Sequence, residues 1–139
     1  MAQGYFEKRL KELGREDIEV SSAGVIPLEG MQATEEAQKV MKEEGIDISG
    51  HRTKMITEYD MRDSDLIFVM EERHKQYVIN KYPKAAKKIY LLKDFKRIGN
   101  LHISENPDIP DPITKDVNFY KETFSVIKEA IERILKEIK

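Results

Sequence analysis

An unbroken run of five apolar residues, Leu66 to Met70, lies in the middle of a 139-residue chain in which 36% of the residues are charged. A strand with one face in water alternates apolar and polar residues, so an unbroken run indicates a strand buried on both faces. Such strands occur in parallel sheets whose two faces are covered by helices. The run therefore predicts an α/β fold, and the length of the chain suits a single domain.

The segments around this run read as alternating helices and strands. Apolar residues at steps of three and four predict a long last helix with Asp116 as its N-cap, and a coiled coil is the alternative to packing on the sheet. Alternation of Ile18 and Val20 with charged residues predicts a strand. The full expectation is helices over 2–13, between Thr34 and Gly45, over 71–81 and from Val117 to Ile138, and strands over 17–21, 66–70 and 89–92.

A polar connection from about Lys93 to Lys115 separates the last predicted strand from the last helix. It is long for a structureless loop, which favours a functional role. Within it, Asp111 stands between Pro110 and Pro112, so its carboxyl group has little backbone freedom and could be aimed at a substrate. An ordinary proline-containing turn is the alternative interpretation.

Polar side chains also gather where strands are expected to end. Ser21, Ser22 and His51 would lie at the edge where open α/β sheets bind ligands. The alternative is that they are loop residues that hydrogen-bond to their own backbone.

Composition excludes several classes of function. The chain has 24 Lys and Arg against 26 Asp and Glu, with no long run of either sign, which argues against a nucleic-acid binder. No apolar stretch could span a membrane, and the start MAQGYFEKRL lacks the apolar core of a secretion signal, so we expect a cytoplasmic protein. The abundance of Lys and Glu resembles hyperthermophile usage, although long charged helices explain it equally well.

Cofactor and metal signatures are missing as well. The chain contains no cysteine, its three histidines (His51, His74 and His102) are far apart, and it has neither GxGxxG nor GxxxxGK[ST]. We expect neither a metal nor a cofactor.

Five segments, in order, resemble the low-molecular-weight protein tyrosine phosphatases: MAQGYFEKRL, VSSAGV, EEGIDISGHRTKMI, DLIFVMEERHKQYV and DIPDPITKDVNFYKETFSVI. The resemblance covers almost the whole chain and implies a three-layer α/β/α fold with a small twisted parallel sheet. The family sheet has four strands, and its first strand has no counterpart here. The resemblance thus implies one phosphatase-like domain over residues 1–139 that is incomplete at its N-terminus.

The resemblance also implies roles for four residues. Asp111 matches the general acid of the family's D-P motif, which protonates the leaving phenolate and then assists the water that hydrolyses a cysteinyl phosphate. Ser22 and His51 match positions that support the phosphate loop, and Leu28 falls near a wall of the substrate cleft. The nucleophilic Cys and phosphate-binding Arg of the family's C-x5-R loop have no counterpart in this chain.

The expected function follows from this combination. A family member of this kind hydrolyses phosphotyrosine proteins or small aryl phosphates, but this chain as given is predicted to be inactive for want of a nucleophile. The alternative is a non-catalytic phosphatase-like protein that binds a partner. If the first family strand is absent, segment 17–21 is expected to pair directly with 65–70, or a second copy is expected to fill the gap.

Overall fold

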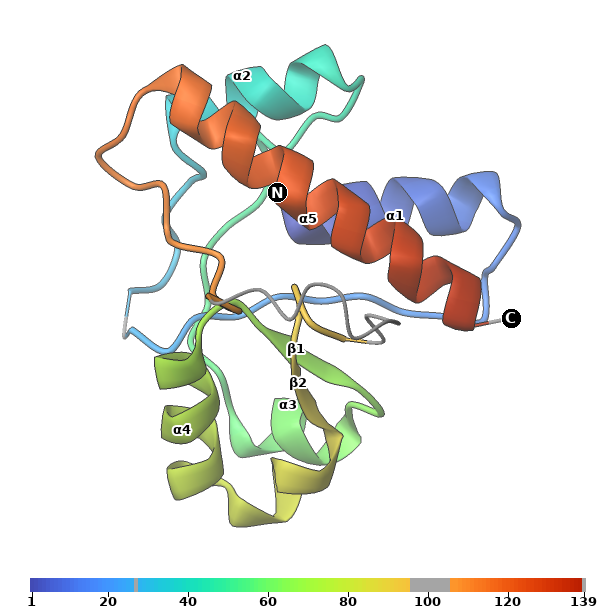
Figure 1. Cartoon of the computed structure of the whole chain (residues 1–139), viewed down its shortest axis with the longest axis vertical. Helices are drawn as coiled ribbons and strands as arrows, with labels where there is room; N and C mark the ends of the chain where they lie inside the picture. Colours follow the sequence, from blue (N-terminus) through green and yellow to red (C-terminus); the bar gives the residue numbers. More distant parts are fainter. Residues whose placement is uncertain (27, 96–105, 139) are drawn as a thin grey trace. The chain divides into compact units, whose positions relative to one another are not determined.

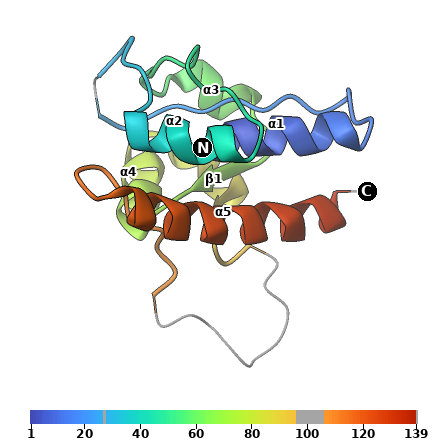
Figure 2. The same ribbon diagram turned by 90° about the horizontal axis from the view of Figure 1, so that it is seen from above.

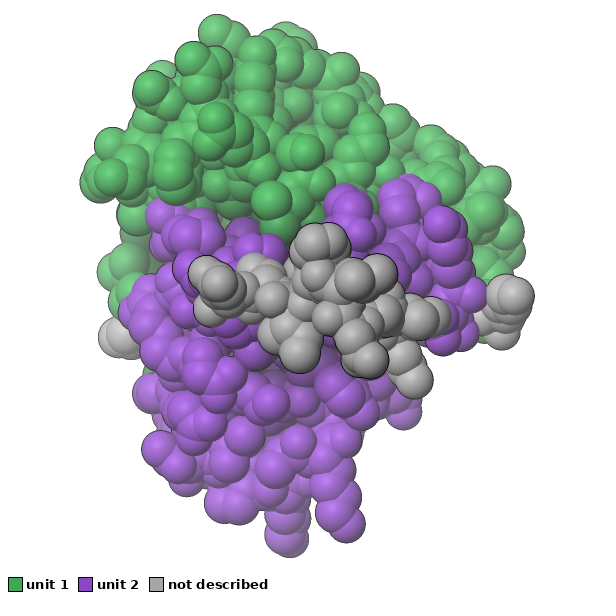
Figure 3. Space-filling model, viewed as in Figure 1, with its two compact units in different colours: residues 1–55, 112–128 green, residues 56–111, 129–139 purple. Residues whose placement is uncertain are grey.

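The computed structural model describes residues 1–26, 28–95 and 106–138. The described elements are α1 (Ala2–Glu12), α2 (Glu35–Glu43), α3 (Glu58–Asp63), β1 (Ile67–Val69), α4 (Glu72–Lys81), the 3-10 helix η1 (Pro83–Lys88), β2 (Ile89–Leu91) and α5 (Val117–Glu137) (Figure 1). They form two compact units (Figure 3). Unit 1 contains residues 1–55 and 112–128, and unit 2 contains residues 56–111 and 129–139.

Unit 1 is built from α1, α2 and the first half of α5. The ring of Tyr5 in α1 meets the ring of Phe124 in α5 edge to face, with centroids 5.6 Å apart. The hydroxyl of Thr34 caps α2 by accepting from the Ala37 N–H and donates to the hydroxyl of Tyr120, 3.0 Å away. Helix ends and aromatic packing thus tie the three helices together. The buried apolar residues of unit 1 are Tyr5, Leu10, Ala37, Val40, Met41, Ile46, Ile48, Tyr120, Phe124 and Ile127.

Helix α1 runs very close to the segment that follows α2. A Cβ atom added to Gly4 would lie 3.0 Å from a methyl carbon of Ile48 and 3.2 Å from one of Ile46. Both isoleucines are buried. Glycine at position 4 therefore allows a close approach that a larger residue would prevent.

Unit 2 contains the sheet. Strands β1 and β2 pair in parallel, with Ile67 opposite Ile89 and Val69 opposite Leu91. Parallel strands need a crossover connection, which α4 and η1 provide, and α4 contacts both strands. The buried apolar residues of unit 2 are Ile56, Met61, Ile67, Val69, Val78, Ala85, Ile89, Leu92, Ile109, Ala130, Ile131 and Ile134.

One arginine fastens the turn after β2 to the second half of α5. The guanidinium of Arg133 donates to the carbonyl oxygens of Lys93 at 2.5 Å and Phe95 at 2.9 Å, and pairs with the Glu129 carboxylate at 2.6 Å. Only 15% of the Arg133 side chain is exposed. Main-chain carbonyls that no strand pairs are thereby satisfied by a charged donor.

The α/β fold class and the main helices predicted from the sequence are confirmed. Asp116 accepts from the Phe119 N–H at 2.9 Å and caps α5, which Figure 2 shows as one uninterrupted helix. Gly14 and Gly45, with φ of +68° and +74°, follow the ends of α1 and α2, where a left-handed residue commonly ends a helix. Helix α3 and η1 were not predicted.

The predicted strand over 17–21 is wrong, and so is its pairing with 65–70. Ile18 and Val20 are half-buried, and their segment carries no strand structure. An extended segment becomes a strand only through main-chain bonds to a neighbouring strand, and the sheet within the described residues consists of β1 and β2. Association of a second copy there stays a prediction, as does the single domain.

Part of the polar connection predicted between Lys93 and Lys115 falls on residues that the structure does not describe. Residues 96–105 of the predicted connection, including His102, lie outside the described residues.

No helix within the described ranges is long and apolar enough to cross a membrane.

Replacing Arg133 by Met should lower the free energy of unfolding by about 1–3 kcal/mol, because two partly buried carbonyls lose a charged donor. Urea denaturation measures the change. Glu129→Gln is the matched control: it removes only the exposed ion pair of Arg133 and should cost about 0–1 kcal/mol. Equal losses in the two variants would contradict this role of Arg133.

Candidate functional site

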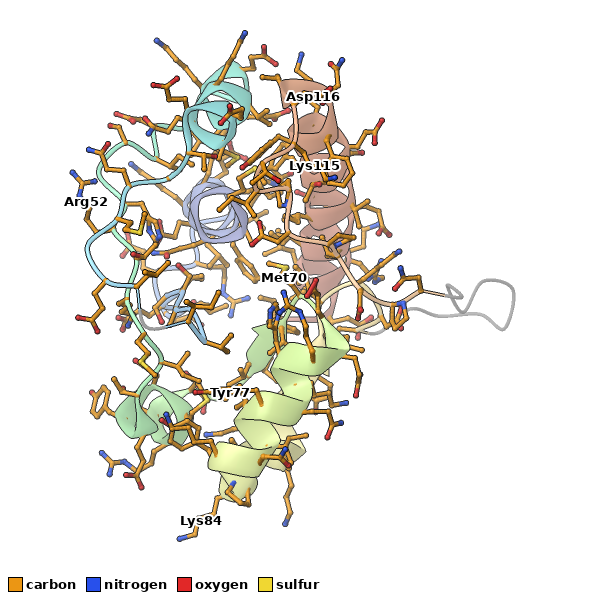
Figure 4. All side chains as sticks on the ribbon, turned by 90° about the vertical axis from the view of Figure 1, so that its left-hand side faces the viewer. Arg52, Met70, Tyr77, Lys84, Lys115 and Asp116 are labelled. Atoms are coloured by element: carbon orange, nitrogen blue, oxygen red, sulfur yellow. The ribbon has the colours of Figure 1, made fainter. Side chains whose placement is uncertain are left out.

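The loop that carries Asp111 is anchored where β1 ends and α4 begins. The N–H of Ile109 donates to the carbonyl of Met70 at 2.8 Å, and the carboxylate of Asp108 accepts from the N–H of Glu72 at 2.8 Å. Met70 stands at this junction (Figure 4). Ile109 is buried with 3% of its surface exposed. Two consecutive positions close to Asp111, Asp108 and Ile109, are thus fixed where β1 ends and α4 begins.

The Asp108 contact has a clear physical cause. The first N–H groups of a helix have no partner inside the helix, and the N-cap residue Glu71 makes no side-chain capping bond to α4. Asp108, 36 residues away, supplies the missing acceptor at the positive end of the helix. The side chain of Asn106 in turn accepts from the Asp108 N–H at 3.0 Å.

A positive charge lies near Asp111. The pKa of the Arg73 guanidinium is raised, first by its hydrogen bond to Glu71 and further by the charges of Glu71, Asp111 and Asp108. Asp111 itself is exposed. An exposed carboxyl group on an anchored loop, with an arginine in its field, can exchange protons with a bound molecule.

In unit 1, Ser22 connects to the first turn of α1. Its hydroxyl donates to the side-chain oxygen of Gln3 at 2.5 Å, and the Gln3 amide donates to the Glu7 carboxylate at 2.9 Å. The segment around Ser22 is therefore attached to α1 by side chains, with its own side chain exposed.

His51 lies near the same turn of α1. Its pKa is lowered, mainly by partial burial and then by the positive charge of the Met1 amino group, while Glu7 opposes the shift. Burial also lowers the pKa of the Met1 amino group. Ser22 thus contacts the start of α1 through Gln3, and His51 lies in the field of the Met1 and Glu7 charges. The predicted polar network of Ser22 and His51 stays a prediction.

Leu28 lies in an exposed loop. The exposed fractions of Ile26, Leu28 and Met31 are 58%, 52% and 52%. The loop is held by main-chain bonds between Met31 and Thr53 and between Gly30 and Thr53.

Within the described ranges, no group of three or more His, Asp or Glu side chains could hold a metal ion.

Comparison with known proteins decides the family. A model of the low molecular weight phosphotyrosine protein phosphatases matches residues 1–139. The chain belongs to this family. It is similar to the crystal structure of the low molecular weight protein tyrosine phosphatase of T. tengcongensis, with a TM-score of 0.88 and 36% identity over 99% of this chain and 88% of that one. The three-layer α/β/α fold class is that of the family.

Two curated phosphatases show the range of relatives. A protein-arginine-phosphatase of Bacillus subtilis is 27% identical over 100% of this chain and 87% of its own length. A low molecular weight protein-tyrosine-phosphatase of Acinetobacter johnsonii is 30% identical over 87% of this chain and 79% of its own. The family therefore includes proteins named for tyrosine and for arginine dephosphorylation.

The phosphatase-family residues predicted from the sequence fall in both units. Ser22, His51 and Leu28 belong to unit 1 and Asp111 belongs to unit 2, and their roles stay predictions. Sequence reasoning missed Asp108 and Arg73, which surround Asp111. A weak signal existed, since Asp108 opens the same proline-containing segment, but its partner Glu72 is distant in sequence.

His51 should titrate at a lower pH in the folded chain than in the urea-unfolded chain, where an ordinary value near ~6.5 applies. The unfolded state then binds the proton more readily, so stability should fall as the pH drops through about 6.5. NMR titration of the ring protons measures the shift, and His51→Gln should reduce the acid-induced loss of stability. A folded pKa at or above the unfolded one would contradict the inferred burial effect.

Asp108→Ala should release the anchored loop. We expect faster hydrogen exchange at the Glu72 and Ile109 amides and a loss of about 1 kcal/mol in unfolding free energy, as for the loss of a helix cap. Asp65→Ala is the control, because Asp65 is an exposed carboxylate in the same unit. If the Glu72 amide exchanges at the same rate in both variants, Asp108 does not anchor the loop.

Proposed function

We propose that this chain is the part of a phosphatase that supplies the general acid, Asp111, for hydrolysis of phosphotyrosine or another aryl phosphate. The observation that carries the proposal is the anchoring of the Asp111 loop by Ile109 and Asp108 at the edge of the parallel sheet. Ligands of open α/β folds bind at the carboxyl ends of the strands, and β1 ends at this anchor. A proton donor is useful only if held in one place.

The proposed reaction needs a thiolate. In the family chemistry a cysteine thiolate attacks phosphorus, the bond between phosphorus and the phenolic oxygen breaks, and Asp111 would give its proton to that oxygen. Water would then attack the cysteinyl phosphate, giving its proton to the Asp111 carboxylate and restoring the thiolate. Asp111 would therefore be protonated when the first step begins and ionised when the second step begins.

The 139 residues contain no cysteine, so no cysteinyl phosphate can form on them. We therefore propose that the chain as given does not turn over aryl phosphates and, without the amides and arginine of a C-x5-R loop, binds inorganic phosphate weakly or not at all. Neither Ser21 nor Ser22 replaces the nucleophile in this proposal. The described contacts of Ser22 include no activating base, only the Gln3 amide oxygen.

The second candidate function is a non-catalytic phosphatase-like binding protein. The absence of cysteine favours it, because the fold is kept while the group that defines the chemistry is missing from these residues. For either function we propose a cytoplasmic protein with no cofactor. The two candidate functions differ in what they recognise: the phosphatase must bind an aryl phosphate, whereas the binding protein need not.

Turnover of p-nitrophenyl phosphate tests the proposal in two chains. The 139 residues alone should show none. The same residues preceded by a strand and a C-x5-R loop of the family pattern should be active, and Asp111→Asn should lower kcat of this hybrid by about 10²–10⁴-fold while inorganic phosphate still binds.

Asp65→Asn in the hybrid is the control and should leave kcat unchanged, because Asp65 is an exposed carboxylate that lies in unit 2 outside the anchored loop. Full activity of the Asp111→Asn hybrid would show that another residue is the acid. Turnover by the 139 residues alone that disappears on Asp111→Asn would overturn the requirement for a cysteine. A hybrid that folds but is inactive would favour the binding protein.

A further inference from the structure

A strongly basic segment begins at the start of α4 and runs to the turn after β2. Residues 73–93 contain seven Lys and Arg and no Asp or Glu. The whole chain has a net charge of −2 and this segment contributes +7, so the other residues carry −9. The cations are spread among uncharged residues and so form no long run of like charge. Positive charge is thus concentrated on one stretch of unit 2.

Some of these cations serve the fold itself. The ammonium of Lys88 donates to the carbonyls of Arg62 at 3.0 Å and Ser64 at 2.6 Å, which fastens η1 to the end of α3. Lys93 donates to the carbonyl of Asn106 at 2.9 Å. These lysines satisfy main-chain oxygens, so their presence needs no external partner.

Three other lysines of this segment donate to no main-chain carbonyl within the described ranges. Lys81, Lys84 and Lys87 are exposed, and within the described ranges none of them forms an ion pair with a carboxylate. Lys84 and Lys87 stand three residues apart in the 3-10 helix η1, where side chains with this spacing share one face. Figure 4 shows Lys84 projecting away from α4 at the end opposite Met70. We call Lys81, Lys84 and Lys87 the lysine surface.

Aromatic rings hold one member of the lysine surface in place. The Lys81 ammonium lies 5.7 Å from the ring centroids of both Tyr77 and Tyr82. This arrangement limits the freedom of the lysine before any partner arrives. Tyr77 is 36% exposed, and tyrosine is enriched in protein interfaces. The surface therefore combines unpaired positive charge with exposed aromatic area.

We propose that the lysine surface binds an acidic segment of a partner protein. Charge complementarity selects an acidic partner, because two or three carboxylates of a short segment could each meet a lysine. Nucleic acid fits less well, because its affinity depends on many phosphate contacts and the lysine surface offers three cations. The partner is thus acidic polypeptide.

The surface is separate from the proposed general acid. Helix α4 has 10 residues, which gives it a length of about 15 Å, and Asp108 anchors the acid loop at its first residue while Lys81 is its last. The lysine surface and the anchor of the acid loop thus lie at opposite ends of α4. Binding there does not depend on whether Asp111 acts as an acid, so the two proposals can fail independently.

The test is binding of fluorescein-labelled octaglutamate to the 139-residue chain, followed by anisotropy. Lys84→Glu/Lys87→Glu should weaken binding by about tenfold or more, and raising the salt from about 50 to about 300 mM should weaken it similarly for the unaltered chain. Lys39→Glu/Lys42→Glu is the matched control, with the same change of charge and spacing on the exposed face of α2, and should change affinity by less than about twofold.

Three outcomes would overturn the proposal. The first is no binding of octaglutamate at low salt by a chain whose circular dichroism shows it folded. The second is an equal loss in the two double variants, which would mean attraction by net charge alone. The third is tighter, lysine-dependent binding of a single-stranded oligonucleotide of equal charge or of phosphatidylserine vesicles, which would assign the surface to another class of partner.

Discussion

Both compact units depend on one apolar stripe of α5. Its first half contributes Tyr120, Phe124 and Ile127 to the core of unit 1, and its second half contributes Ile131 and Ile134 to the core of unit 2. Burying a large apolar side chain contributes about 1.5–3 kcal/mol, and a single helix supplies several such side chains to each unit. Sheet pairing contributes less, since β1 and β2 have three residues each. Helix packing therefore carries the stability that the short sheet does not provide.

The ends of secondary elements position the candidate site. The first N–H groups of α4 require an acceptor, and the carbonyl at the end of β1 requires a donor. Asp108 and Ile109, one after the other in the loop, meet these two requirements. The same groups that would be unsatisfied without the loop therefore fix its position. The end of β1 and the start of α4 thus determine where the Asp111 side chain lies, although Asp111 belongs to neither element.

Features that depend on interactions between residues close in the sequence could be predicted, and features that depend on distant residues could not. Helices α1, α2 and α5 could be predicted because their apolar spacing and the caps Thr34 and Asp116 are local. The strand over 17–21 could not, because a strand depends on a neighbour that its own residues do not specify. Helix α3 has a local signal in the capping box of Thr57 and Asp60, but its six residues are too few for an apolar periodicity. In the site, the proline-bracketed Asp111 could be found, whereas the bond from Glu72 to Asp108 spans 36 residues and has no sequence signature.

The charges at the two ends of α4 have different explanations. The carboxylate of Asp108 at its start and Lys81 in its last turn both complement the helix dipole, which stabilises α4. Dipole effects fall off within one turn, and Lys84 and Lys87 lie beyond the end of α4 in η1. Solubility would be served by cations and anions mixed together, as on the rest of the chain, and not by a segment without a single carboxylate. What remains unexplained by folding is therefore the exposed pair on η1, and an acidic partner is the simplest physical reason for it.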